Sequence, residues 1–484
     1  MKITFIRYNI ITLKIMSEEV KEGLEYKGIG KYRDRIINGP IISTLIWLGL
    51  PPLVNQIVMV AYHFFDAYWL SMYSDFAVAV PRQTWPVIML FQAVLNALTA
   101  ASLSMVSQYI GAKAFKDASL SASKFFTVSF TLGGLFFITF LSLRNIIFSI
   151  LISVPPEIFN DIMDYSGVIA LDVFLNYISF IYTTLLQSVG DTRRPAIVNV
   201  IAVTTNVFFD PLLIFGIGPF PRLGVIGAAA TDVMGKIISI IGLTYILRKS
   251  YPELRVKFTR DIDFEWIKLV LRIGVPILAL GLTNSFAFLF QLRLVNTFGV
   301  IVATAYSIGF VVMDIVDGAL WGFVGANSIM VGQNLGAGNI HRAREVSYKS
   351  ALLLFGVITL GSIILYPFKQ NIVTIFTDNP QIIAETDMFL QTLLPTLSFF
   401  GLFMMGMSTG RGSGHTIVPT IIGIIRLWII RIAMGYMLAL TLGLGSFGIW
   451  LALSLSNVVG GTIAILWIKY GNWTKAVVRR TKTI

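Results

Sequence analysis

Two polar side chains and a proline interrupt the apolar segment TTNVFFDPLLIFG, residues 204–216. Asn206 and Asp210 are four residues apart, which places them on one face of a helix. Pro211 has no backbone N–H, so the carbonyl of Val207 loses its helical partner. A carboxylate, an amide oxygen and a free carbonyl are suitable ligands for Na⁺, and a carboxylate in an apolar setting can instead carry a proton. The alternative is a structural kink whose two polar residues bond to neighbouring helices.

The composition shows what kind of chain holds these residues. Of 484 residues, 56% are hydrophobic and only 13% are charged, whereas soluble proteins carry roughly 25% charged residues. Several apolar runs approach the roughly 20 residues that a spanning helix needs. The short alternating segments of a membrane barrel are not present in the sequence. We therefore expect an all-α polytopic membrane protein.

The apolar runs predict twelve transmembrane helices. The loop between the sixth and seventh is long and charged, and it is the best candidate for a linker between two halves. The expected spans are 41–72, 84–108, 123–143, 163–188, 195–216, 224–247, 267–296, 301–332, 350–367, 388–408, 417–441 and 446–468.

The positive charges predict the orientation of these spans. Of 37 Lys and Arg residues, 28 lie in or beside the N-terminal segment and the loops that follow even-numbered spans, whereas the alternate loops carry four. The positive-inside rule then places both termini in the cytoplasm of a multi-pass protein of the cell membrane. Either Met1 or Met16 could be the true start.

The two halves of the sequence repeat each other in the same orientation. Residues 49–51 (GLP) recur as 274–276 (GVP), and 108–112 (QYIGA) recur as 333–337 (QNLGA), both 225 positions later. Six spans per copy makes the repeats parallel, so we expect two pseudo-symmetric six-helix lobes with a cavity between them. The expected parts are a cytoplasmic segment 1–40, an N-lobe 41–247, a cytoplasmic linker 248–266, a C-lobe 267–468 and a basic cytoplasmic tail 469–484.

The repeat also shows where the halves differ. Asp66 corresponds to Gln291 and Asp210 to Met434, so only the first half carries both carboxylates. An acid inside a membrane is costly and normally faces a cavity, pairs or titrates. From their depths along the spans, we expect one polar site in the outer half of the N-lobe, formed by Asp66, Tyr165, Asn206, Asp210 and Thr231.

The segment GDTRRPAIVNVIAVTTNVFFDPLLIFG, the following LGVIGAAAT and the repeated Gln-x-x-Gly-Ala motifs resemble the multidrug and toxic compound extrusion (MATE) family. The resemblance is to its archaeal and DNA-damage-inducible branches. It implies cation-coupled antiport of organic cations or other amphipathic compounds. It also implies that Asp66 and Asp210 are the key coupling groups, with Asn206, Tyr165 and Thr231 beside them.

Several other polar residues lie within the expected spans. Another branch of the family has a glutamate where this chain has Asn284, so a C-lobe cation site of that kind is not expected here. We expect a local ion pair between Asp232 and Lys236, which are four residues apart. The candidates for lining a substrate cavity are Asp172, Asp314, Asp317 and Asn284. Asp172 could instead extend the N-lobe acid network or bond to a neighbouring hydroxyl, and Asp314 and Asp317 could instead pair with Arg293, Arg426 or Arg431.

The sequence favours a secondary transporter over an enzyme. It has no Walker, HExxH or GxSxG motif, no cysteine, and only three scattered histidines. We expect an antiporter driven by H⁺ or Na⁺ and working by alternating access, without a cofactor or bound metal beyond possible Na⁺ at Asp66, Asn206 and Asp210. Its partners would be membrane lipid and cationic or amphipathic small molecules, not nucleic acid, and a monomer would suffice. The alternative is a flippase for lipid-linked oligosaccharides from the same wider superfamily.

Overall fold

A computed structural model describes residues 28–74, 77, 79–152, 154–374 and 376–478. The expectations for residues 1–27 and 479–484, including the choice of start, lie outside this part. The elements in the first half are α2 (Arg33–Asn38), α3 (Ile41–Tyr73), α4 (Ala79–Gly111), α5 (Phe115–Ile146), η1 (Ile147–Leu151), α6 (Pro156–Val189), α7 (Arg193–Phe215) and α8 (Val225–Ser250). Those in the second half are α9 (Phe264–Asn296), α10 (Val300–Gly336), α11 (Ile340–Leu365), η2 (Tyr366–Phe368), α12 (Lys369–Val373), α13 (Pro380–Leu393), η3 (Leu394–Thr396), α14 (Leu397–Ser413), α15 (Ile417–Ile424), η4 (Ile425–Ala433), α16 (Met434–Tyr436), η5 (Met437–Thr441) and α17 (Gly445–Tyr470).

Twelve helical spans of this described part are long and apolar enough to cross a membrane, which confirms the predicted number and the all-α class. Each span holds at least 23 residues, and roughly 20 residues rise the 30 Å of a bilayer core. Four spans are built from more than one element: α5 with η1, α11 with η2 and α12, α13 with η3 and α14, and α15 through η5. Most helices begin or end beyond the predicted apolar runs.

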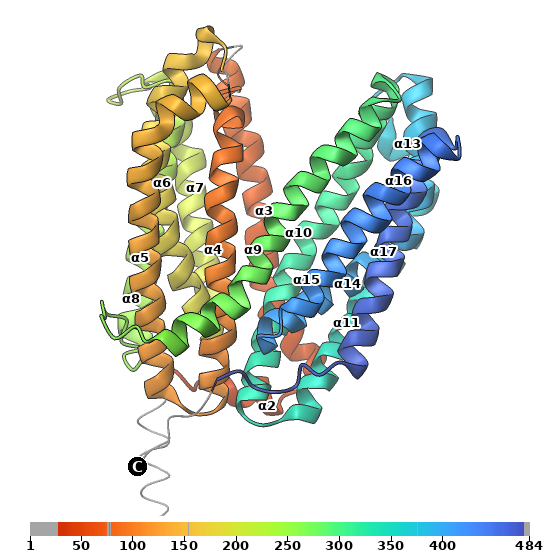
Figure 1. Cartoon of the computed structure of the whole chain (residues 1–484). Helices are drawn as coiled ribbons and strands as arrows, with labels where there is room; N and C mark the ends of the chain where they lie inside the picture. The colour runs from red at the N-terminus through yellow and green to blue at the C-terminus, as the bar shows by residue number, and fades with distance from the viewer. Residues whose placement is uncertain (1–27, 75–76, 78, 153, 375, 479–484) are drawn as a thin grey trace, which may run out of the picture.

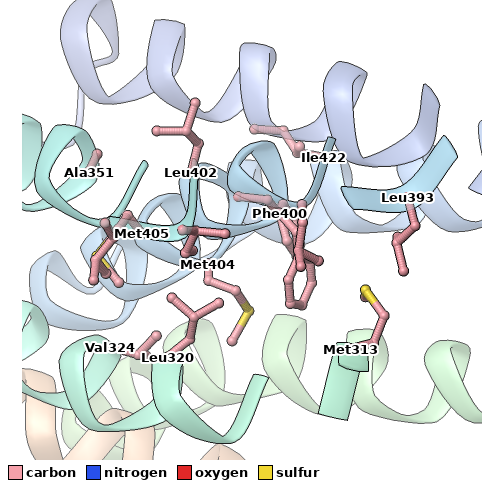
Figure 2. Packing of buried hydrophobic residues seen from close by; sticks show 14 of the residues in the cluster. Met313, Leu320, Val324, Ala351, Leu393, Phe400, Leu402, Met404, Met405 and Ile422 are labelled. Atoms are coloured by element: carbon pink, nitrogen blue, oxygen red, sulfur yellow. The ribbon is translucent and has the colours of Figure 1, made fainter. Parts of the chain in front are cut away.

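The spans form two bundles, the N-lobe of α3–α8 and the C-lobe of α9–α17 (Figure 1). The bundles meet at the end where α2 and the C-terminal segment lie, and they lean apart toward the other end (Figure 1). We call these the basic end, after its Lys- and Arg-rich loops, and the opposite end. One apolar core fills the C-lobe and continues across the lobe contact to Leu45 and Leu48 of α3 and Leu103 of α4. Within it, Met313 and Leu320 of α10 pack near Phe400 and Met404 of α14 (Figure 2).

At the basic end, the repeated motif forms the crossing between the lobes. A Cβ added at Gly111 of α4 would lie 2.0 Å from the carbonyl oxygen of Gln333, and one at Gly336 of α10 would lie 1.9 Å from that of Gln108. The two helix ends therefore touch backbone to backbone, which only glycine permits.

The two glutamines of this motif bond across the lobes in a symmetric way. Nε2 of Gln108 donates to the carbonyl of Gly412 at 3.1 Å, and Nε2 of Gln333 donates to the carbonyl of Ser188 at 2.9 Å. Ser188 and Gly412 are 224 residues apart and so are equivalent positions of the repeat. Two equivalent hydrogen bonds, one donated from each lobe, therefore join the lobes at the basic end.

Both terminal segments add to this contact. Arg33 of α2 donates through Nε and Nη2 to the carbonyl of Gly111, at 3.0 and 2.8 Å. After α17 the chain crosses back, with Trp473 fully buried in the C-lobe core. The backbone N–H of Val477 then donates to Oε1 of Gln108 at 2.9 Å. The C-terminal segment thus ties one lobe to the other.

Candidate cation site in the N-lobe

Four helices of the N-lobe build the predicted polar site. α7 packs against α3 and α8, and α8 packs against α6. Glycine at position 235 of α8 leaves room for Asn206 of α7, because a Cβ there would lie 2.3 Å from its Oδ1. α7 continues as one helix from Arg193 to Phe215 with Pro211 inside it.

Asp210 is the most enclosed acid of the site, with no exposed surface. The hydroxyl of Thr231 on α8 donates to its Oδ1. Its Oδ2 is buried and has no hydrogen-bond partner within the described structure. A carboxyl oxygen held in this way is available to a proton or a cation, because an unpaired buried acceptor is costly.

Asn206 and Asp232 form the second part of the site. The Asn206 amide is best satisfied when its nitrogen faces the carbonyl oxygens of Ala202 and Thr231, at 3.0 and 2.8 Å. In the other orientation of the amide, Nδ2 of Asn206 donates to Oδ1 of Asp232 at 3.3 Å. Tyr62 of α3 donates its hydroxyl to the same Oδ1 at 2.5 Å.

Two further groups, Asp66 and Tyr165, lie near Asp210 and Asp232. Asp66 of α3 lies in electrostatic range of Asp210, and its Oδ1 is buried without a partner among the described residues. Tyr165 of α6 is buried and lies in electrostatic range of the carboxylates of Asp66, Asp172, Asp210 and Asp232. The structure thus brings together all five residues predicted for the N-lobe site.

Asp232 shows where the prediction was wrong. No ion pair within 4.0 Å joins it to Lys236 in the described chain. Its Oδ1 instead accepts from the hydroxyl of Tyr62 and from the amide of Asn206. Lys236 remains in electrostatic range of Asp232 and of Asp172. Asp172 lies in electrostatic range of Asp232, which fits its alternative place in the N-lobe acid network. Tyr62 was missed, although its position one helical turn before Asp66 was a usable signal.

The C-lobe candidates are separate from this site. Asp314 and Asn284 are exposed, and Asp317 is half-buried and accepts from Nε1 of Trp321 at 3.1 Å. Neither aspartate forms an ion pair within 4.0 Å with any arginine of the described residues, so the predicted pairing with Arg293, Arg426 or Arg431 is not seen. No group of three or more His, Asp or Glu side chains that could hold a metal occurs in the described part.

Comparisons with known proteins give the family. The MatE family model matches twice, at residues 51–212 and 276–437, and the two matches begin and end 225 residues apart like the sequence repeat. A probable multidrug resistance protein NorM of Thermotoga maritima is 26% identical over 90% of this chain and 94% of its own. An FAD transporter of Shewanella oneidensis is 25% identical over 89% and 95%. The Vibrio cholerae MATE transporter VcmN in the bent form shares the fold, with a TM-score of 0.83 at 18% identity, over 89% of this chain and 96% of that one.

A twelve-helix, two-lobed membrane chain with acids buried in one lobe is a transporter rather than an enzyme. The two family matches cover most of both lobes, and this chain belongs to the MatE family. Its relatives by sequence and structure are small-molecule transporters.

Proposed function

We propose that this protein is a cation-coupled antiporter that exports amphipathic small molecules, organic cations among them, across the cell membrane. The observation that carries the proposal is Asp210: it is fully buried, one oxygen is held by Thr231, and the other is free beside Asp66. An acid of this kind inside a membrane gains most from a proton or Na⁺ that arrives and leaves.

The arrangement of the lobes supports alternating access. At the basic end, Gln108 and Gln333 join the lobes, while at the opposite end the bundles diverge (Figure 1). With the basic end in the cytoplasm, as the charge distribution indicates, the site in the N-lobe lies nearer the outer side, because Asp66 and Asp210 are close to the far ends of α3 and α7. A cation entering from outside would bind Asp66 and Asp210 and favour release of cargo.

Coupling follows if the ion and the cargo disfavour each other. Binding of one must then weaken binding of the other by the same factor. Asp66 and Tyr62 lie on α3, which contacts α7 of its own lobe and α10 of the other. α3 is therefore the element through which occupation of the acids would reach the lobe contact. H⁺ and Na⁺ both suit these oxygen groups.

The test is gradient-driven transport in proteoliposomes of the full chain. Fluorescent organic cations are loaded, H⁺ or Na⁺ gradients are imposed, and wild type is compared with Asp210→Asn. We expect efflux under one gradient and its loss in the variant. Asp161→Asn removes an exposed acid of α6 and should leave efflux unchanged.

Two results would contradict the proposal. Undiminished gradient-driven efflux in Asp210→Asn would remove the N-lobe acid from the mechanism. Absence of efflux under either gradient, together with translocation of a lipid-linked oligosaccharide, would favour the flippase alternative. Dependence of the efflux rate on the square of the protein-to-lipid ratio would argue against a functional monomer.

A further inference from the structure

The C-lobe contains two buried arginines that the transport mechanism above does not use. Arg426 and Arg431 are only 5% and 9% exposed. They lie near the middle of the span formed by α15, η4, α16 and η5, so they are deep in the membrane by position in the chain. Arginine keeps its charge at any physiological pH, and a charge at this depth requires compensation.

A π-helix brings the two side chains together. Arg426 and Arg431 are five residues apart, which in an α-helix would turn them about 140° away from each other. Both lie in η4, nine residues of π-helix in which each N–H bonds to the carbonyl five residues earlier. In that geometry residues five apart share a face. Local π-helix of this kind is frequent at functional sites.

Both guanidinium groups converge on one side chain. Nη1 of Arg426 and Nη2 of Arg431 donate to Oδ1 of Asn457 on α17, at 3.1 and 3.4 Å, and Nε of Arg431 donates to Oγ of Ser456 at 3.1 Å. Gly460, one turn further along α17, leaves room for the Arg426 stem, because a Cβ there would lie 2.5 Å from its Cδ. Residues of both η4 and α17 therefore hold the two arginine side chains in place.

No acid neutralises this pair. None of the described Asp or Glu side chains comes within 4.0 Å of either arginine, and Asp317 acts on Arg426 only at longer range. The rings of Phe400 and Phe403 on α14 cover the Arg426 guanidinium, at 5.3 and 4.5 Å; Phe400 is seen in Figure 2. Aromatic faces attract a cation but do not cancel its charge.

Two hydrogen-bond donors at this position are also unused. Nε of Arg426 and Nδ2 of Asn457 are buried and have no acceptor within the described structure. Donors left in this way, beside two uncompensated positive charges, call for an acceptor that carries negative charge.

We propose that Arg426, Arg431 and Asn457 form a binding site in the C-lobe for the anionic group, a carboxylate or a phosphate, of an amphipathic molecule. The apolar part would lie against the Phe- and Met-rich core of α14. As the binding place of cargo, this site rests on the proposed transport function; as an anion site, it does not. The bound molecule would be a transported compound or an anionic lipid, which offer the same headgroup chemistry.

The experiment measures equilibrium binding to the purified full chain in neutral detergent, without a gradient. The probes are 2-naphthylacetate, its neutral amide and naphthyl phosphate. We expect both anions to bind and the amide to bind about tenfold or more weakly, since hydrogen bonds to a charged group are worth roughly that factor or more. Arg426→Met should weaken the two anions by about tenfold and leave the amide unchanged, Arg426→Lys should fall between, and Arg293→Met, which removes an exposed arginine of the same lobe, should match wild type.

The outcomes separate cleanly. Equal affinity for 2-naphthylacetate and its amide on wild type would overturn the proposal without any variant. So would undiminished anion binding in Arg426→Met with an unchanged unfolding temperature. Displacement of the probe by phosphatidylglycerol but not phosphatidylcholine micelles would support the site and assign it to lipid. Because no transport is measured, failure of Asp210-dependent efflux would leave this result standing.

Discussion

Replacing Gly336 with alanine tests the contact that closes the basic end. The new Cβ would lie 1.9 Å from the backbone carbonyl of Gln108, against the 3.4 Å or more of an ordinary contact, so α4 and α10 must separate by about 1.5 Å. Overpacking of this kind costs roughly 1–3 kcal/mol. If this cost applies only to the closed state, it raises the population of the state with an open basic end by roughly 5- to 150-fold.

The assay uses the absence of cysteine from the chain. Ser188→Cys places one thiol at a fully buried position whose carbonyl accepts from Gln333. Its rate of maleimide labelling reports opening of the basic end, and we expect Gly336→Ala to raise that rate by roughly 5- to 150-fold. Gly325→Ala is the control in the same helix, since nothing lies within 4 Å of its Cβ. Equal labelling rates in the two glycine variants would refute the close-contact argument.

Two further predictions concern the segments around this contact. Lys124 and the backbone N–H of Trp266 both donate to Asp263. These bonds, that of Lys124 first, hold the pKa of Asp263 below its usual 3.8. Asp263→Asn keeps the helix cap and should lower the free energy of unfolding by less than about 1 kcal/mol at pH 7. Because the folded pKa is lowered, this stabilisation is present above about pH 3.8 and is lost as the pH falls through the folded value. The unfolding curves of variant and wild type should therefore converge in acid. A stability difference that does not change with pH would contradict this. Trp473→Ala removes a fully buried ring whose Nε1 donates to the Ile468 carbonyl at 3.0 Å; it should cost about 3–5 kcal/mol and speed labelling at Ser188→Cys, whereas Trp85→Ala, at a half-exposed ring, should do neither.

The spans and the repeat were predictable from the sequence because both depend directly on the types of side chain present. Apolar runs determine the spans, and the 225-residue offset follows from motifs such as 108–112 and 333–337. Helix ends were less predictable: the third span was expected at 123–143, whereas α5 begins at Phe115. Its first turns are polar but still helical, since a helix that leaves the membrane no longer needs apolar residues.

The N-lobe acids were also accessible from the sequence, because a carboxylate in an apolar run is conspicuous. The partner of Asp232 was not. Lys236 lies four residues away, but Tyr62 reaches Asp232 from another helix, 170 residues distant in the chain. The π-helix that brings Arg426 and Arg431 together has no simple sequence signal, because it depends on backbone hydrogen bonds rather than on side-chain type.

The repeat and the charges together suggest that the two lobes share one helical arrangement but carry different charged groups in it. The equivalents of Asp66 and Asp210 in the C-lobe are Gln291 and Met434, so the C-lobe has lost, or never had, the acids. It holds Arg426 and Arg431 instead, both facing Asn457. Opposite charges in the two lobes mean that a coupling cation and an anionic cargo group would not compete for the same atoms. If binding of one weakens binding of the other, the effect must pass through the helices that join the lobes. The contact of α4 with α10 at the basic end is shared by both lobes, so both ligands would act on it.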